Sequence, residues 1–327
     1  MHQGIGTELE NYLALLRTTA GFIAGSDDVT VSEFGDYAAY INFDKNYPGL
    51  LGIGFTIRVP EGKTAELGAM MREQGHENFT IWPSYEGEQY STIFLEPLNS
   101  RNKAAIGYNM FSETTRREAM IRARDTGLLA ASGKVRLVQE IDEDVQAGFL
   151  IYLPFYGFVP PPDTVELRRK EIKGFVHAPI RVGDFMNSVL ERENPNINIA
   201  VYENTNIKER ALLFLSPDYQ ESNKVIRRDL SVAGRTWTIA YEPSHSPLPD
   251  PAIIAYLIVL LVGFLACCKL GWLVWLEEQA RLAIIASEER LRRIIDNTAA
   301  FVGEVDRSGT VLEINKGSLQ IANLQRE

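Results

Sequence analysis

The most constraining feature of this sequence is a run of 25 residues, 252–276, that contains a single charged residue, Lys269. An α-helix rises about 1.5 Å per residue, so the run would extend about 37 Å, enough to cross a hydrocarbon core of about 30 Å with some tilt. The alternative is a buried core helix, but such helices are usually shorter and keep a polar stripe. The run therefore predicts one transmembrane helix over residues 252–276.

The charges on either side of this run predict its orientation. The twenty residues before it contain one Lys or Arg, Arg235, whereas the twenty after it contain four arginines. Cytoplasmic flanks are enriched in Lys and Arg. We therefore expect a cell (inner) membrane protein with residues 277–327 in the cytoplasm and residues 1–250 in the periplasm or outside the cell. The first residues lack the pattern of a signal peptide, so export of the outer part requires an upstream membrane helix, and we expect a piece of a longer protein.

Composition excludes several classes of function. The 33 Lys and Arg against 43 Asp and Glu give a formal charge of −10, and phosphate binding needs a basic surface, so we expect no nucleic-acid partner. Cys267 and Cys268 lie inside the apolar run and cannot build a disulfide framework or a Cys-based zinc site. The four histidines have no metal-ligand spacing, and no phosphate-binding loop or nucleophile elbow is present. We expect no catalytic site, metal or cofactor in this chain.

Ahead of the membrane run, the hydrophobic pattern predicts an α+β fold. Apolar residues at helical spacing over 5–23 indicate a long first helix, which we expect to act as a stalk. A second helix follows with Ser32 as its N-cap, and the fourth expected helix, which begins at Glu113, has Ser112 as its N-cap. The first block of the fold has expected strands at 50–59, 78–82, 89–95, 134–140 and 147–155, with helices near 62–75 and 113–124.

Three prolines at 160–162 separate this block from a second one. Each block is expected to form a small module around an antiparallel sheet. The second block has expected strands at 172–178, 197–203, 211–215, 224–232 and 235–242, with a short helix near 183–190.

The outer part contains, in this order, the segments NYPGLLGIGF (46–55), GEQYSTIFLEP (87–97), NKAAIGYNMFSETTRREAMIRARDTG (102–127), VRLVQE (135–140), GFLIYLPFY (148–156) and KGFVHAPIRVGDFM (173–186). Together these segments resemble the CHASE family of extracellular sensory domains. The family occurs on receptor histidine kinases and nucleotide cyclases, including plant cytokinin receptors. The resemblance implies a stalk helix and two tandem PAS-like modules, the outer of which binds a small ligand between its sheet and a helical loop. The family commonly has an aspartate where Asn109 stands here.

The resemblance also implies ligand contacts. Glu88 stands where cytokinin receptors have an aspartate that accepts hydrogen bonds from an adenine-like ligand, and Tyr90 matches the tyrosine that follows. Gly148 matches a glycine that lets a ligand approach the sheet backbone closely. Plainer roles stay open, namely a solvated carboxylate for Glu88 and core packing for the aromatic residues. The candidate ligand-binding residues are Glu88, Tyr90, Phe94, Gly148 and Phe149.

Beyond the membrane run, apolar residues recur along one side of a charged segment, which predicts a signalling helix over 277–296. From there the sequence resembles the first third of a PAS domain, with two strands joined by a turn at 306–309. The expected parts of the chain are a stalk and second helix (1–44), a membrane-distal PAS-like module (45–160), a membrane-proximal PAS-like module (161–248), a transmembrane helix (252–276), a signalling helix (277–296) and a truncated PAS domain (297–327).

Together these features predict the sensor of a two-component histidine kinase. We expect a homodimer through the stalk helix that binds a small molecule, adenine-like or another small metabolite, and regulates a cytoplasmic output enzyme. The alternative output is a diguanylate or other nucleotide cyclase. Two other classes remain open. A membrane-anchored extracytoplasmic enzyme predicts a catalytic constellation in a pocket. A structural protein that dimerises through its first helix predicts that no ligand cavity exists.

Overall fold

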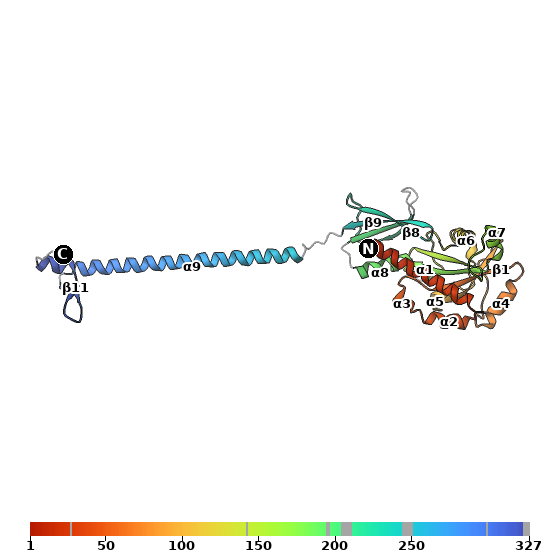
Figure 1. Cartoon of the computed structure of the whole chain (residues 1–327), viewed down its shortest axis with the longest axis horizontal. Coiled ribbons are helices and arrows are strands. Elements are labelled where there is room, and N and C mark those ends of the chain that lie inside the picture. The colour runs from red at the N-terminus through yellow and green to blue at the C-terminus, as the bar shows by residue number, and fades with distance from the viewer. Residues whose placement is uncertain are drawn as a thin grey trace. The chain divides into compact units, whose positions relative to one another are not determined.

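The computed structural model describes residues 1–26, 28–141, 143–193, 197–203, 211–243, 251–298 and 300–322. The chain divides into two compact units, Met1–His245 and Ser246–Glu327 (Figure 1). The first unit is built on two antiparallel sheets, and the second contains one long helix followed by a β-hairpin. This organisation confirms the mixed α and β fold with antiparallel sheets.

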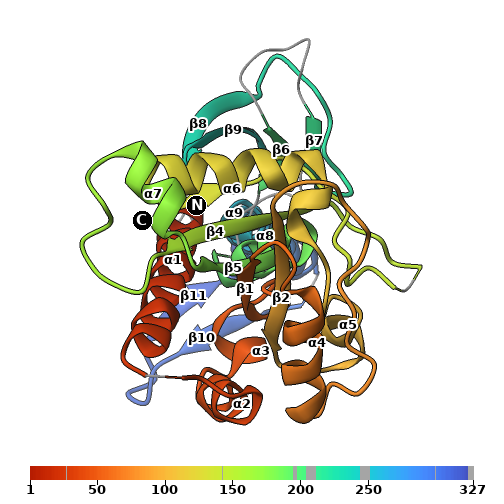
Figure 2. The same cartoon turned by 90° about the vertical axis from the view of Figure 1, so that its right-hand side faces the viewer.

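The larger sheet of the first unit has five strands, and all their pairings are antiparallel (Figure 2). Its central strand pairs with a neighbour on each side, so that Tyr152 lies opposite His177 and Phe55 lies opposite Val176. The strand order is β2 (Gln89–Glu96), β1 (Ile53–Val59), β5 (Gly174–Arg181), β4 (Gly148–Phe155) and β3 (Ala130–Ala131).

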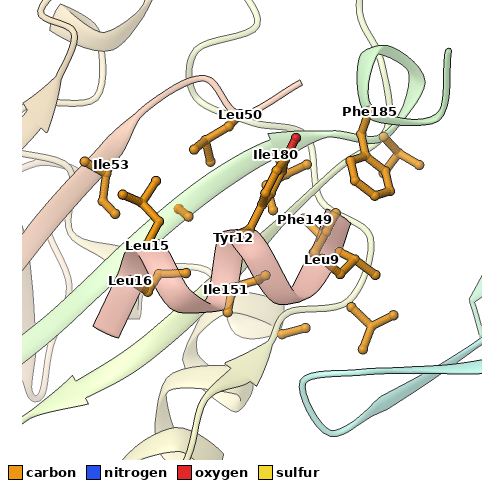
Figure 3. Close-up of a cluster of buried hydrophobic side chains, with 14 of the residues drawn as sticks. Leu9, Tyr12, Leu15, Leu16, Leu50, Ile53, Phe149, Ile151, Ile180 and Phe185 are labelled. Carbon is orange, nitrogen blue, oxygen red and sulfur yellow. The ribbon is translucent and has the colours of Figure 1, made fainter. Parts of the chain in front are cut away.

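One face of this sheet is covered by α1 (His2–Ala24), which was predicted as the long first helix. Its buried residues pack with apolar side chains from the strands, in a core drawn in Figure 3. Burial of this stripe holds α1 against the sheet, because each fully buried Leu or Phe side chain contributes about 1.5–3 kcal/mol. The labelled members of this core are Leu9, Tyr12, Leu15, Leu16, Leu50, Ile53, Phe149, Ile151, Ile180 and Phe185.

The opposite face is covered by α6 (Thr114–Thr126) and the short 3₁₀ helix η1 (Met110–Ser112). Successive side chains of a strand point to opposite faces, and β4 follows this rule. Phe149 and Ile151 belong to the α1 side, whereas Leu150 and Tyr152 belong to the α6 side. The sheet therefore separates two cores within one unit.

Two helix starts differ from the expected ones. Thr30, not Ser32, is the N-cap of α2 (Val31–Ala39), because its side chain accepts from Glu33 N while the Glu33 carboxylate accepts from Thr30 N. Glu113, not Ser112, is the N-cap of α6, since its carboxylate accepts from two amides of the first turn. The remaining helices of the first unit are α3 (Phe43–Asn46), α4 (Thr64–Glu73), α5 (Ser100–Lys103), α7 (Val165–Glu171) and α8 (Val182–Glu193).

The smaller sheet has four strands and lies next to β4 through an edge contact between Phe149 and Trp237, whose ring centroids are 4.9 Å apart. Its last hairpin turns at Ala233 and Gly234, both with positive φ, as tight two-residue hairpins require. The strand order is β7 (Ala211–Leu215), β6 (Ile197–Glu203), β9 (Arg235–Pro243) and β8 (Ile226–Val232), close to the predicted strands.

Two of the expected strands do not form, and a third belongs to a different sheet from the one expected. Residues 78–82 contain only an isolated bridge from Trp82 to Tyr108. The strand expected over 134–140 is irregular apart from a bridge at Val135, because the end of this segment is held by side-chain contacts instead of a ladder. The strand expected at 172–178 in the second block is β5, the centre of the first sheet, which therefore extends past residue 160.

The second unit begins with α9 (Pro251–Asp296), a continuous helix of 46 residues. Among the described residues it is the one helix that is long and apolar enough to cross a membrane. A hairpin of β10 (Gly303–Val305) and β11 (Val311–Ile314) follows, and then α10 (Lys316–Ala322). The Asp306 carboxylate accepts from the amides of Ser308 and Thr310 in the hairpin turn, at the place predicted for it.

Candidate ligand-binding site

The α6 side of the five-stranded sheet contains polar side chains that are fully buried. Thr56, Thr92 and His177 come from three neighbouring strands, and none is exposed to solvent. The Thr56 hydroxyl lies 3.1 Å from His177 Nδ1 and 3.4 Å from the Thr92 hydroxyl. Buried polar groups of this kind rarely occur in a core unless they hydrogen-bond with one another or with a ligand.

His177 is one of the groups on this face whose hydrogen bonding is incomplete. Its burial lowers the pKa to about 3, so the imidazole is neutral at physiological pH. Its Nε2 atom is inaccessible to solvent and has no hydrogen-bond partner in the described part of the chain. An unpaired buried polar atom costs about 1–3 kcal/mol, and a ligand or an ordered water that reached Nε2 would recover that cost.

Further polar atoms on the same side of the sheet are buried and unpaired within the described residues, among them Tyr90 Oη, Asn109 Nδ2 and Arg116 Nε. Asn109 accepts from the Tyr90 amide at 3.2 Å, and Arg116 donates to the Arg136 carbonyl at 2.8 Å. These bonds hold both side chains in place while leaving one donor of each unused. The α6 side therefore offers unused hydrogen-bond donors at Asn109 and Arg116, and an unpaired ring nitrogen at His177.

Glu88 precedes β2 and lies at the end of the sheet. One carboxylate oxygen is 2.8 Å from Arg58 Nη2, and the other is 2.8 Å from Arg124 Nη1. The side chain also lines a groove of about 830 Å³ together with Arg58, Lys170 and Lys173. Both Glu88 oxygens are thus held by arginines, and a ligand that used them would share or replace these ion pairs.

Tyr90 and Gly148 both belong to the α6 side. The Tyr90 ring is fully buried, 4.4 Å from the Phe111 ring and 5.3 Å from the Phe175 ring, and burial followed by the charge of Glu88 raises its pKa. A Cβ atom at position 148 would lie 2.4 Å from Leu137 Cγ. The space left by the missing side chain of Gly148 is therefore filled by Leu137.

Phe94 and Phe149 lie on the other side of the sheet. The Phe94 ring stacks on Phe34 at 4.9 Å, in the core that α1 covers, and Phe149 packs against Trp237. The structure therefore brings Tyr90 and Gly148 to one face, places Glu88 at the end of the sheet, and separates Phe94 and Phe149 from them by the sheet itself. His177, Asn109 and Arg116 were not among the predicted ligand-binding residues, because no local sequence pattern marks a residue whose partners come from distant segments of the chain.

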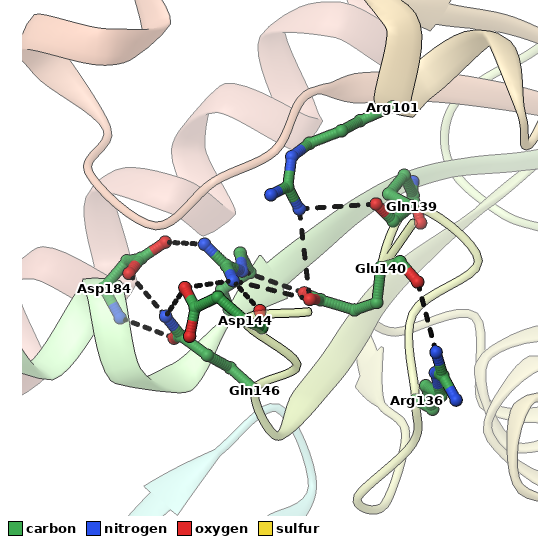
Figure 4. Close-up of polar contacts among 8 residues, drawn as sticks. Arg101, Arg136, Gln139, Glu140, Asp144, Gln146 and Asp184 are labelled. Carbon is green, nitrogen blue, oxygen red and sulfur yellow. Dashed lines mark hydrogen bonds and ion pairs between the residues drawn. The ribbon is translucent and has the colours of Figure 1, made fainter. Parts of the chain in front are cut away.

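A cluster of charged residues anchors the segment that follows α6 and β3. The Arg181 guanidinium lies 2.8 Å from Glu140, 2.7 Å from Asp184 and 3.0 Å from Asp144 (Figure 4). The Glu140 side chain is fully buried. This cluster ties an irregular segment to the end of β5 and the start of α8. In the described ranges, no three His, Cys, Asp or Glu side chains are grouped so that they could hold a metal ion.

The buried imidazole predicts a pH dependence of stability. The folded-state pKa of about 3 lies below the ordinary value of 6.5, so between these values the unfolded chain binds a proton that the folded chain does not. Stability is therefore complete above pH 6.5 and falls as the pH drops, by about 2 kcal/mol between pH 7.5 and pH 5. Chemical denaturation of the wild type and of His177→Gln at both pH values measures this difference.

The control is His76→Gln, which removes a half-buried histidine whose pKa burial also lowers. We expect this variant to retain most of the loss of stability on acidification, and His177→Gln to remove most of it. If the wild type and His177→Gln lost the same stability between pH 7.5 and pH 5, His177 would be protonated in the folded chain as readily as in the unfolded chain.

Comparison with known proteins adds two findings. A family model described as the CHASE domain matches residues 27–214, which begins after α1 and ends within β7. Hybrid signal transduction histidine kinase A of Dictyostelium discoideum is 26% identical over 183 residues, a match that covers 48% of this chain and 8% of that protein. The chain therefore spans a small part of the length of this relative.

Proposed function

Because this chain belongs to the CHASE domain family, we propose that it is the sensory part of a membrane receptor and binds a small molecule on the α6 side of its five-stranded sheet. The observation that carries the proposal is the buried His177 Nε2 atom, which lacks a partner in the described part of the chain. Asn109 and Arg116 supply two further unused donors. A ligand of metabolite size whose acceptors face Asn109 and Arg116, and which forms a hydrogen bond with the His177 ring nitrogen, matches these groups.

The sites implied by the family resemblance then take different roles. Tyr90 and Gly148 border the ligand on the α6 side. Glu88 lies at the end of the sheet, where its carboxylate forms ion pairs with Arg58 and Arg124. Phe94 and Phe149 act from the opposite face, where they stabilise the sheet. An adenine-like compound remains one candidate, since such rings carry acceptors and donors together.

The two sheets are proposed to be the PAS-like modules, membrane-distal for the five-stranded sheet and membrane-proximal for the four-stranded sheet. We assign α1 as the stalk and as the contact between two copies of the chain. Its outward side exposes polar, charged or small residues, among them Gln3, Thr7 and Ala14, and this is the side that we propose faces the second copy. The hairpin after α9 is proposed to begin a cytoplasmic PAS domain.

The proposed topology places residues 1–250 outside the membrane and residues 277–327 in the cytoplasm, with α9 crossing between them. The name of the relative supports a histidine kinase as the regulated output, and a nucleotide cyclase is the alternative. In either case the ligand must bind two arrangements of the receptor with different affinity, because otherwise binding produces no signal.

A thermal-shift screen of the full chain in lipid nanodiscs tests this function. The compounds are adenine derivatives, amino acids, carboxylates and other small metabolites. A ligand at a hundredfold excess over its dissociation constant stabilises the folded state by about 2.7 kcal/mol. A saturable shift that His177→Gln abolishes supports the assigned face, and a shift that this variant leaves unchanged contradicts it. Turnover of the bound compound would favour an extracytoplasmic enzyme instead.

Glu88 has its own test with a compound that this screen identifies. If its carboxylate accepts a hydrogen bond from the ligand, Glu88→Ala should weaken the affinity about tenfold or more, since a hydrogen bond to a charged group contributes about 1.5–3 kcal/mol. Isothermal titration calorimetry measures the change. Glu86→Ala removes an exposed carboxylate two residues away and should leave the affinity unchanged. Unchanged affinity in Glu88→Ala, with the fold intact, contradicts the role implied by the cytokinin receptors.

A further inference from the structure

The irregular segment 132–141, here called the strap, lies along the edge of β4 on the α6 side. Val135 and Gly148 exchange both backbone hydrogen bonds, at 2.8 and 3.0 Å. The side chains of Val135 and Leu137 belong to the same buried cluster as Tyr152 and Phe175. The strap therefore closes the face on which we place the ligand.

Leu137 is the point at which the strap and the proposed site compete for space. Its side chain is 2% exposed, and three of its atoms lie within 2.4–2.9 Å of where a Cβ on Gly148 would stand. A ligand that approached the backbone at Gly148 would meet Leu137 first. Occupation of this place by a ligand requires the strap to move.

One end of the strap is fixed. The Glu140 carboxylate is fully buried and lies 2.8 Å from Arg181, which also bonds to Asp184 at the start of α8. Breaking a buried ion pair is costly, because it leaves an unpaired charge in the interior. Displacement of Leu137 is therefore transmitted toward the other end of the strap.

That other end, together with Ala131 of β3 immediately before it, is bonded to the second sheet. The Ala131 amide donates to the Ala233 carbonyl at 2.9 Å, and the Ala131 carbonyl accepts from Arg235 Nε at 3.2 Å. The Lys134 amide donates to the Glu203 carboxylate at 2.8 Å, and Glu203 forms an ion pair with Arg235. Arg235 begins β9, which is the last strand before α9 along the chain.

We infer that the strap is the relay of this receptor: a ligand displaces Leu137 from Gly148, and the contacts of Ala131 and Lys134 pass the displacement to Glu203 and Arg235 in the second sheet. The inference rests on the proposed function, because it assigns the moving part of the same ligand site. The two states are the strap closed on β4 and the strap lifted from it.

The relay can be tested without a ligand by hydrogen exchange of the full chain in nanodiscs. In Gly148→Ala the new methyl group takes the place of Leu137 and acts as a permanent substitute for the ligand. We expect amide hydrogen exchange in peptides covering 130–135 to become about tenfold faster or more, and the exchange rate of β9 to change as well. The double variant Gly148→Ala with Leu137→Ala removes the clash and should return both regions to within about twofold of wild type. Gly21→Ala, at a helix position with open space, is the matched control.

A second pair of variants tests the contact with β9. Adding Arg235→Gln to Gly148→Ala should remove the change in β9 while leaving the change in the strap. Arg227→Gln removes an exposed ion pair with Glu221 from the same sheet and should leave both changes intact. An unchanged strap in Gly148→Ala, a double variant as fast as the single one, or a β9 response that survives Arg235→Gln overturns the relay.

These outcomes are separable from those of the ligand screen. A compound that binds without changing exchange at 130–135 overturns the relay and leaves the receptor function standing. A strap that responds to Gly148→Ala, in a chain that binds none of the screened compounds, supports the relay and counts against a ligand of the screened classes.

Discussion

Replacing Phe149 with alanine is expected to lower the free energy of unfolding by about 3–5 kcal/mol, the usual range for an aromatic residue lost from a core. The Phe149 side chain is 1% exposed and packs edge-on against Trp237 at 4.9 Å, so it joins the two sheets. Its removal leaves a cavity where β4 meets β9, and neither sheet can close it alone. Urea denaturation of the full chain in nanodiscs measures the loss.

The matched control is Phe158→Ala, since the Phe158 side chain is 51% exposed. We expect a change within about 0.5 kcal/mol for this variant. The Phe149→Ala prediction is contradicted if this variant keeps nearly wild-type stability but no longer binds the ligand. That outcome would move Phe149 from the core into the binding site and contradict the assignment of the ligand to the α6 side.

Arg181→Ala is expected to destabilise the chain by a similar amount, about 3–5 kcal/mol, because the buried Glu140 carboxylate loses its ion pair at 2.8 Å and keeps the more distant Arg101, 3.9 Å away. The Arg181 side chain is 8% exposed and that of Glu140 is not exposed at all. Asp144 and Asp184 lose the same partner, which adds repulsion among the three carboxylates. The same denaturation measurement applies.

Two variants separate the buried charge from the general loss of an arginine. Arg227→Ala removes a pair whose side chains are 38% and 55% exposed, and exposed pairs contribute at most about 1 kcal/mol. Arg181→Met combined with Glu140→Leu removes both buried charges and should recover much of the loss. A loss below about 1 kcal/mol for Arg181→Ala would mean that water reaches Glu140 in the folded state.

The sequence predicted which segments are regular better than it predicted where they lie. The apolar run and most strands of the first unit follow from hydrophobic length and alternation, which are local properties. The place of β5 does not, because it pairs with β1 more than a hundred residues earlier in the chain. Pairing of this kind depends on which strands become neighbours in the fold, and this cannot be predicted from the local sequence pattern.

The candidate site shows the same limit at the scale of single residues. Tyr90 and Phe94 are four positions apart, and a regular strand would place both on one face. In β2 the register with β1 shifts between Thr92 and Phe94, and this bulge turns Phe94 to the α1 side. Bulges redirect side chains in this way, and nothing in the local sequence signals this one. The role of His177 likewise depends on Thr56 and Thr92 from two other strands.

The uninterrupted course of α9 determines the kind of motion it can carry. A helix of 46 residues is about 69 Å long at about 1.5 Å per residue, more than twice the thickness of a hydrocarbon core of about 30 Å. It contains no internal proline, and proline is a common cause of sharp kinks. The angular position of one end is therefore coupled to that of the other. One added residue would rotate the following hairpin by about 100° about the helix axis. A change of one residue in α9 therefore alters the direction in which the hairpin faces far more than its distance along the helix.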